Sequence, residues 1–147
     1  MFKIYRISTK ELYILNLFFI DDDNTYLYLL KRTCTKFKEI EAIHTAENGD
    51  DAIKKINEWL RLKSQLPNIM FVDINMPKMN GIDFLKNFKL MCKVHPQLET
   101  IKPIAMLTSS QHSSDKERCM ETGIVSEYII KPEGKKDMEK VIKHVLG

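Results

Sequence analysis

The sequence predicts an α/β fold in which five parallel strands form one sheet, with helices on both faces. Strand-like and helix-like patterns alternate five times between Leu15 and Gly147, and right-handed crossovers place such units in a single sheet. The candidate strand Ile69 to Val72 is a short apolar run without polar alternation, which is typical of strands buried on both faces. With 147 residues, 44% of them hydrophobic and 29% charged, the chain is suited to one globular domain.

The clearest strand lies within the segment Pro67 to Gly81. Its apolar residues Ile69 to Val72 end on the carboxylate of Asp73, and a turn ending at Gly81 leads into the next helix. In open α/β sheets, ligands bind outside the C-terminal ends of the strands. A single aspartate at this position is often a helix cap or a turn former, so its role depends on what the other strand ends carry.

Three other predicted strands also end on polar side chains. In a parallel sheet these ends meet at one edge, together with Asp73. Each group alone has an ordinary explanation as a helix cap, a turn former or a surface charge, but four unrelated turns would not assemble acids, hydroxyls and a lysine at one edge by chance. The run Leu15 to Ile20 ends on Asp21, Asp22 and Asp23, the run Ile104 to Leu107 ends on Thr108, Ser109 and Ser110, and the run Tyr128 to Ile130 ends on Lys131 and Pro132.

The amino-terminal half contains two further helices with a strand between them. Apolar residues three and four positions apart predict that each helix turns one stripe towards the core. The first helix runs from its cap at Asn24 to about Lys36 and buries Leu27, Leu30 and Cys34. A strand follows from Ile40 to Ala46. After a turn at Gly49, the second helix buries Ala52, Ile53, Ile56 and Leu60, with Trp59 at the edge of the stripe.

The carboxy-terminal half contains three helices of unequal strength. The segment Asp115 to Thr122 has few apolar residues, so we expect it to pack weakly, with Gly123 as its C-cap. The other two helices have continuous apolar stripes. One runs from Ile82 to about Val94 and buries Phe84, Leu85, Phe88, Met91 and Cys92. It ends at His95 and Pro96, and a polar connection from Gln97 to Lys102 follows. The last helix buries Met138, Val141, Ile142, Val145 and Leu146.

Charge, cysteine and histidine usage exclude several classes of protein. The net charge of +3 comes without a concentrated basic block or interleaved aromatic residues, so we expect no direct binding to nucleic acid. The three cysteines are widely spaced without a CxxC pair, which predicts reduced, buried thiols and suits the cytoplasm. Neither the cysteines nor the four histidines have metal-ligand spacing, so any metal should be bound by oxygen.

The first residues superficially imitate a secretory signal, because basic residues precede the apolar segment Leu12 to Ile20. Glu11 and Asn16 interrupt that pattern, no small-residue cleavage site follows, and three aspartates come directly after it. We therefore expect neither a signal peptide nor membrane insertion. Met1 to Glu11 is interpreted as an N-terminal extension, and residues 12–147 as the domain.

Four motifs in this order and spacing resemble the receiver domain of two-component response regulators. The resemblance covers the chain from about Leu15 onwards, and its nearest match in architecture is the stand-alone receiver of the chemotaxis type. It implies a flavodoxin-like, doubly wound (βα)5 fold and a phosphoryl donor that is a histidine kinase or a histidine phosphotransfer protein. It also implies a switch that acts on a downstream protein target rather than an enzyme. The motifs are IDDD at Ile20 to Asp23, VDINMPKMNG at Val72 to Gly81, LTSS at Leu107 to Ser110 and YIIKP at Tyr128 to Pro132.

The resemblance also implies roles for individual residues. Asp73 matches the aspartate that accepts the phosphoryl group, and Thr108 and Lys131 match the hydroxyl and the lysine that contact this group. Tyr128 matches the aromatic residue of the switch. The implied cofactor is Mg²⁺, bound by Asp21, Asp22, Asp73 and the main-chain carbonyl of Asn75, and Pro132 matches a proline that follows a cis peptide bond.

The chemistry of these residues agrees with the resemblance, although two alternatives stay open. A carboxylate is already ionised at pH 7, so phosphoryl transfer to Asp73 requires mainly positioning and neutralisation of charge. One alternative is a phosphorylation-independent binding module of receiver fold. The other is a phosphatase that forms an aspartyl-phosphate, such as a haloacid dehalogenase-like enzyme, but Asn75 stands where that family has a second aspartate. The sequence departs from the receiver pattern at Ser109, which replaces a small alanine, and in the long connection Val94 to Lys102.

Overall fold

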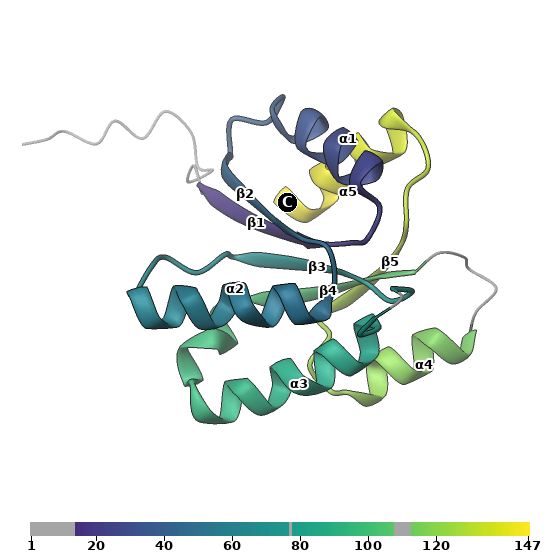
Figure 1. The fold of residues 1–147 in the computed structure, drawn as a ribbon. Helices are drawn as coiled ribbons and strands as arrows, with labels where there is room; N and C mark the ends of the chain where they lie inside the picture. Colours follow the sequence, from purple (N-terminus) through teal and green to yellow (C-terminus); the bar gives the residue numbers. More distant parts are fainter. Residues whose placement is uncertain (1–13, 77, 108–112) are drawn as a thin grey trace, which may run out of the picture.

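The computed structural model describes residues 14–76, 78–107 and 113–147. Its centre is one five-stranded sheet in the order β2-β1-β3-β4-β5, and each neighbouring pair of strands is parallel. All five strands therefore end at the same edge (Figure 1). The strands are β1 (Leu15–Ile20), β2 (Ile40–Ala46), β3 (Ile69–Asp73), β4 (Lys102–Leu107) and β5 (Glu127–Ile130).

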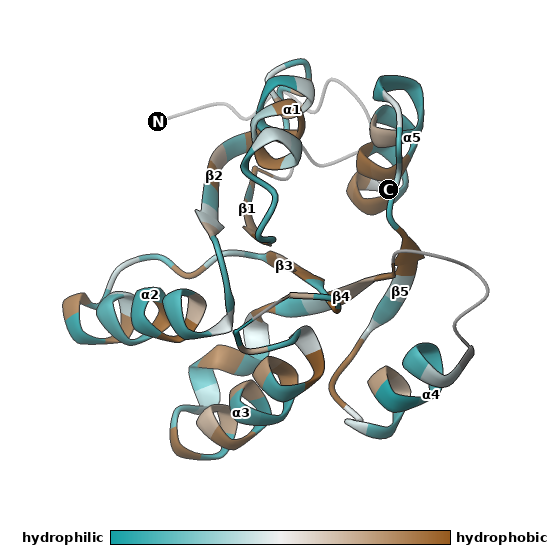
Figure 2. Cartoon of the chain, turned by 45° about the vertical axis from the view of Figure 1, so that its right-hand side comes forward, coloured by the Kyte–Doolittle hydropathy of each residue, from teal (hydrophilic) through white to brown (hydrophobic). Residues whose placement is uncertain are grey.

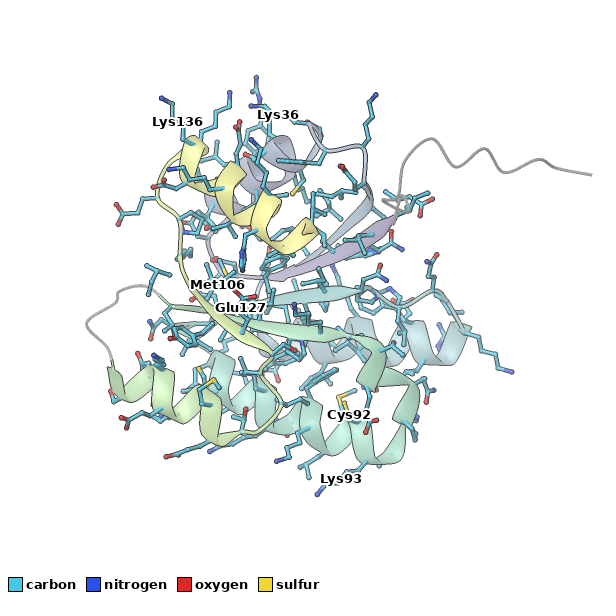
Figure 3. The ribbon with its side chains drawn as sticks, turned by 180° about the vertical axis from the view of Figure 1, so that it is seen from behind. Lys36, Cys92, Lys93, Met106, Glu127 and Lys136 are labelled. Carbon is cyan, nitrogen blue, oxygen red and sulfur yellow. The ribbon has the colours of Figure 1, made fainter. Side chains whose placement is uncertain are left out.

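Helices cover both faces of the sheet, as the sequence predicts. Figure 1 shows α1 and α5 together on one face, and α2, α3 and α4 on the other. On the first face an ion pair between Lys36 and Glu139 links the turn after α1 to α5. Figure 3 shows Lys36 and Lys136 at the outer side of this layer. The α-helices are α1 (Asn24–Cys34), α2 (Gly49–Leu62), α3 (Gly81–Val94), α4 (Ser113–Glu121) and α5 (Lys135–Leu146).

Two apolar layers hold the helices against the sheet. Successive strand residues point to opposite faces, so Phe18 and Met70 pack under α2 and α3, whereas Phe19 and Phe71 pack under α1 and α5. The rings of Phe19 and Phe71 stack with centroids 4.6 Å apart. Because both faces are buried, the central strands β1 and β3 are apolar at most positions, with Asn16 in β1 and the terminal Asp73 of β3 as polar exceptions. This explains why these strands appear in the sequence as nearly continuous apolar runs.

In the described part of the chain, three helices begin at side-chain caps, and two of these caps differ from the expected ones. The side chain of Asp23, not that of Asn24, accepts the backbone N–H of Tyr26, so Asn24 is the first residue of α1. Likewise, Asn48 caps α2, and Gly49 is its first residue rather than a separate turn. Aspartate and asparagine are both good N-caps, so adjacent candidates such as Asp23 and Asn24 are not distinguished by type alone.

The connection between α3 and β4 is a 3-10 helix, η1 (Pro96–Thr100), where the sequence predicts an irregular polar segment. Leu98 is fully buried in the layer below α3. The single apolar side chain therefore anchors the turn to the core. Strand β4 begins at Lys102, two residues earlier than the apolar pattern indicates, because pairing of Lys102 with Ile69 extends the ladder beyond the buried residues.

Helix α4 is the least apolar helix, as the sequence predicts (Figure 2). Cys119 is its only buried residue among the side chains that are described. Gly123 follows the helix with a φ of 72°, the left-handed conformation that glycine adopts at a helix C-terminus. The ammonium of Lys89 in α3 donates to the carbonyl of Thr122 at 2.7 Å and so ties this end of α4 to α3.

All three cysteines are free and buried, as predicted. Trp59 lies at the rim of the core, where it meets the rings of Phe18 and His44 edge to face. None of the helices in the described part of the chain combines the length and the apolar character that a membrane crossing requires. The predicted N-terminal extension, Met1 to Glu11, lies outside the described residues.

Candidate functional site

Three carboxylates lie together at the C-terminal edge of the sheet. Asp21 directly follows β1, and Asp73 is the last residue of β3. One carboxylate oxygen from each of Asp21, Asp22 and Asp73 lies within 4.8 Å of the other two. Asp21 and Asp73 are 4% and 2% exposed, whereas Asp22 is exposed. The cluster thus has two buried acids and one that faces solvent.

Lys131 brings a positive charge to these acids from β5. Its ammonium nitrogen lies 2.7 Å from Oδ2 of Asp21 and 3.6 Å from Oδ2 of Asp73. The backbone fixes its position, because the N–H of Lys131 donates to the carbonyl of Leu107 at 2.6 Å. The peptide bond before Pro132 is trans, which corrects the expectation of a cis bond; the trans form is the more stable isomer of X–Pro bonds by about 0.5–1 kcal/mol.

The electrostatics of the cluster are unbalanced. Burial raises the pKa of Asp73 to about 6, and the negative charge of Asp21 adds to this effect, while Lys131 and the backbone N–H of Asn75 partly offset it. Burial opposes the charge of Lys131, but its hydrogen bond to Asp21 and the nearby Asp73 raise its pKa overall. Among the described residues, one cation thus faces three carboxylates, and this excess of negative charge favours a further cation.

The donor atoms fit a hard divalent cation. All three side chains offer carboxylate oxygens, the ligands that Mg²⁺ and similar ions prefer. Asn75, two residues after Asp73, is anchored beside them because its backbone N–H donates to Oδ1 of Asp73 at 3.1 Å. A cation bound here would thus be held by residues at the C-terminal ends of β1 and β3, which are neighbours in the sheet.

The turn after β3 is held by a close backbone approach at Gly81. A Cβ on this residue would lie 2.3 Å from the carbonyl oxygen of Asp73 and 2.7 Å from Cα of Ile74. The N–H of Gly81 also donates to the carbonyl of Ile74 at 3.1 Å. Only glycine allows α3 to begin this close to the strand end, and the close turn keeps Asp73 at its place in the cluster.

The predicted site residues divide into three groups. The structure brings Asp21, Asp22, Asp73 and Lys131 together, with Asn75 beside them. Thr108 lies outside the described residues, as do Ser109, Ser110 and Pro77. Tyr128 belongs to the layer under α2, α3 and α4, where the Lys116 ammonium lies 4.3 Å from its ring centroid.

Sequence reasoning missed one residue of this site, Tyr26. Its ring centroid lies 4.2 Å from the ammonium of Lys131, and its hydroxyl oxygen is buried without a hydrogen-bond partner among the described residues. Burial raises the pKa of Tyr26, and Asp21 and Asp73 add to this rise. The available signal was its position in the first turn of the helix that follows the aspartates.

Comparisons with known proteins agree with this geometry. The family model of the response regulator receiver domain matches residues 17–143. The chain is 33% identical over 118 residues to a protein-glutamate methylesterase/protein-glutamine glutaminase of Bacillus subtilis; this match covers 78% of the chain but only 29% of that protein, namely its receiver part. It is 27% identical over 134 residues to a chemotaxis protein CheY homolog of Campylobacter jejuni, covering 90% of the chain and 93% of the homolog.

Solved structures show the same fold. The Mn²⁺-bound form of the response regulator Rcp1 superposes with a TM-score of 0.71 at 21% identity, covering 89% of this chain and 91% of that one. The prediction of a flavodoxin-like, doubly wound sheet is thereby confirmed. The match to the family model over most of the chain, the identity to receiver-containing relatives and the shared fold lead to one conclusion: the chain belongs to the response regulator receiver domain family.

Proposed function

We propose that this receiver accepts a phosphoryl group on Asp73 from a histidine kinase or a histidine phosphotransfer protein in a Mg²⁺-dependent reaction. The proposal rests above all on one observation: Asp73 is 2% exposed and has its Oδ2 3.6 Å from the Lys131 ammonium, inside a cluster of three carboxylates. A buried acid with one cation and two anionic neighbours needs a second cation before a negatively charged phosphoryl group can approach, and this is the part that Mg²⁺ would take.

The transfer is a single displacement at phosphorus. One carboxylate oxygen of Asp73 supplies the electron pair of the new O–P bond, and the bond between phosphorus and the donor breaks, so that its electron pair leaves with the donor. Lys131 neutralises charge on the phosphoryl oxygens. Asp21, Asp22, Asp73 and the main-chain carbonyl of Asn75 would hold Mg²⁺, which supplies further positive charge to the same oxygens when bound.

The proposed output is a change on the face formed by α4, β5 and α5. A phosphoryl group on Asp73 offers new acceptor oxygens to the Thr108 hydroxyl, and movement of this residue would alter the space beside β4 into which Tyr128 can turn. Tyr128 pairs with Ala105 of β4 and carries Lys116 of α4 on its ring. The switch would therefore act on a downstream protein target through α4.

We place the protein in the cytoplasm, since three buried free thiols suit a reducing compartment.

The test is incubation of the protein with acetyl phosphate and Mg²⁺, followed by mass spectrometry. We expect one phosphoryl adduct on Asp73 that is labile to alkali and hydroxylamine, as an acyl phosphate is. Asp73→Asn should abolish the adduct. Lys131→Gln should slow its formation on the order of 10²-fold, the usual cost of removing one positioned hydrogen-bond donor that stabilises charge in the transition state.

Asp83→Asn is the matched control, because Asp83 is an exposed carboxylate in the first turn of α3. It should label like the wild type. An adduct that persists in Asp73→Asn would contradict the assignment of Asp73. Continuous turnover of a phosphate ester would support a phosphatase instead, and a wild-type protein without any adduct would support a phosphorylation-independent module.

A further inference from the structure

Among the residues that the structure describes, the Lys131 ammonium lies close to two carboxylates and one aromatic ring. Its ammonium lies 2.7 Å from Asp21, 3.6 Å from Asp73 and 4.2 Å from the ring centroid of Tyr26. The lysine side chain is only 18% exposed. A cation over a ring face is attracted by the ring quadrupole, and this attraction is strongest where water is excluded. The ring of Tyr26 thus stabilises this ammonium in its observed position.

The backbone of Tyr26 is linked through Asp23 to Asp21, one of the two acids that Lys131 contacts. Oδ1 of Asp21 accepts the N–H of Asp23 at 2.9 Å, and Oδ1 of Asp23 accepts the N–H of Tyr26 at 3.0 Å. Tyr26 in turn contacts Lys131, which returns to Asp21 through the ion pair. These contacts close a ring of four residues, so Tyr26 has a defined position relative to the carboxylates.

Lysine needs such a neighbour more than most cations do. Its ammonium is a compact charge at the end of a flexible stem of four carbon atoms. The nearer carboxylate, Asp21, would draw it away from Asp73. A ring that covers one side of the ammonium restricts it to the space between the two acids and keeps it from turning to solvent.

We propose that Tyr26 is a positioning residue of this receiver: its ring face holds the Lys131 ammonium between Asp21 and Asp73. The inference rests on the proposed function only for its consequence, which is the rate of phosphoryl transfer to Asp73. The position of Lys131 itself is a property of the unphosphorylated protein. The hydroxyl of Tyr26 has no part in this role, because it has no hydrogen-bond partner among the described residues.

The first experiment observes Lys131 directly by NMR in protein labelled with ¹³C-lysine, without Mg²⁺ or phosphoryl donor. Protons on the ε-carbon above a ring face are shifted upfield, and the Lys131→Arg variant identifies the signal because it loses it. We expect the upfield shift in the wild type and in Tyr26→Phe, which keeps the ring. It should be lost in Tyr26→Leu, whereas Tyr28→Leu should keep it, because Tyr28 is 60% exposed on the same helix.

The second experiment measures the rate of Asp73 labelling by acetyl phosphate. Tyr26→Leu should slow labelling by about tenfold, which is the effect of losing roughly 1.4 kcal/mol of stabilisation. Tyr26→Phe and Tyr28→Leu should label at the wild-type rate. Tyr26→Met is prepared alongside, and rates are compared only among variants that still unfold cooperatively, so that a loss of folding is not mistaken for a loss of positioning.

The outcomes separate this inference from the proposed function. A wild-type protein without an upfield Lys131 signal would overturn the inference at once, whatever the variants do. It would also be overturned if Tyr26→Phe slowed labelling as much as Tyr26→Leu, since the hydroxyl would then be the active group. Failure of acetyl phosphate to label the wild type would instead defeat the proposed function and leave the NMR result standing.

Discussion

At the scale of single residues, Asp73 is held in an unfavourable charge state. Burial and the charge of Asp21 raise its pKa to about 6, against a reference value of 3.8. Ionised Asp73 is the nucleophile that the proposed transfer requires. Ionising Asp73 therefore costs more free energy in the folded protein than in the unfolded chain, so the free energy of unfolding should depend on pH.

The first prediction is that metal-free protein loses stability as the pH rises from about 4 to about 6. In this range the folded state binds more protons at Asp73 than the unfolded state does, so the free energy of unfolding falls with pH. A shift from 3.8 to about 6 corresponds to about 3 kcal/mol in total. Urea unfolding in EDTA at several pH values should show this fall in the wild type.

Asp73→Asn should remove that part of the pH dependence, because the amide does not titrate. Asp83→Asn, a change at an exposed acid in α3, should leave it in place. Equal pH profiles for the wild type and Asp73→Asn would show that the Asp73 carboxyl ionises in the folded protein at its ordinary pKa.

At the scale of elements, α4 is attached to the rest of the molecule by few contacts. Cys119 is its only buried residue among the described side chains, and Lys116 places its ammonium 4.3 Å from the ring of Tyr128 on β5. The carbonyl of Thr122, just beyond the helix, accepts the ammonium of Lys89. A helix attached by single side chains can change position at a low cost in free energy.

The second prediction concerns the contact between α4 and β5. Lys116→Met should lower the free energy of unfolding by only about 0.5–1 kcal/mol, the usual worth of an exposed cation–π contact. Amide exchange across 114–130 should become faster, with little change in α1 and α5. Lys116→Arg keeps a cation over the ring and should behave as the wild type does; if it loosens α4 as Lys116→Met does, the contact with Tyr128 does not hold this helix.

The elements show where sequence reasoning succeeds and where it fails. The bounds of β1 and the first four residues of β3 follow from their apolar runs, because burial on both faces leaves little choice of residue type. The predicted bounds of β2 are also correct, although this edge strand is only partly buried. The 3-10 helix around Leu98 was not predicted, since one buried side chain in a polar segment gives no period. Tyr26 was missed for another reason: its contact with Lys131 joins α1 to β5, and no local pattern encodes a contact between distant elements.

At the scale of the whole molecule, the cluster joins strand ends that the sheet alone positions. Asp21 and Asp22 follow β1, and Asp73 ends β3. Parallel pairing of these strands, with Ile20 opposite Val72, places the backbone of Asp21 beside that of Asp73. The sequence could predict this edge because four of the predicted strands are followed directly by polar residues, whereas the distances between the side chains depend on packing.

The third prediction is that Mg²⁺ raises the melting temperature. A ligand that binds only the folded state at tenfold its Kd stabilises by about 1.4 kcal/mol, and each kcal/mol raises the Tm of a chain of this size by roughly 2–4 °C. Asp22→Asn should stabilise the metal-free protein slightly, because it relieves repulsion, and it should weaken the response to Mg²⁺.

Glu99→Gln is the control for this measurement, since Glu99 lies in η1, ahead of β4 and at the opposite edge of the sheet. This variant should respond to Mg²⁺ as the wild type does. If Asp22→Asn shows the full response, Asp22 is not part of a metal site.

The ion pair between Asp21 and Lys131 joins residues from near the two ends of the fold, and this has a consequence during synthesis. The chain leaves the ribosome amino end first, so the aspartates emerge long before the lysine. Until β5 has paired with β4, a nascent chain holds its acids without their counter-charge. We therefore expect a partly translated receiver to compete poorly for the kinase, so that only chains complete through β5 take part in signalling.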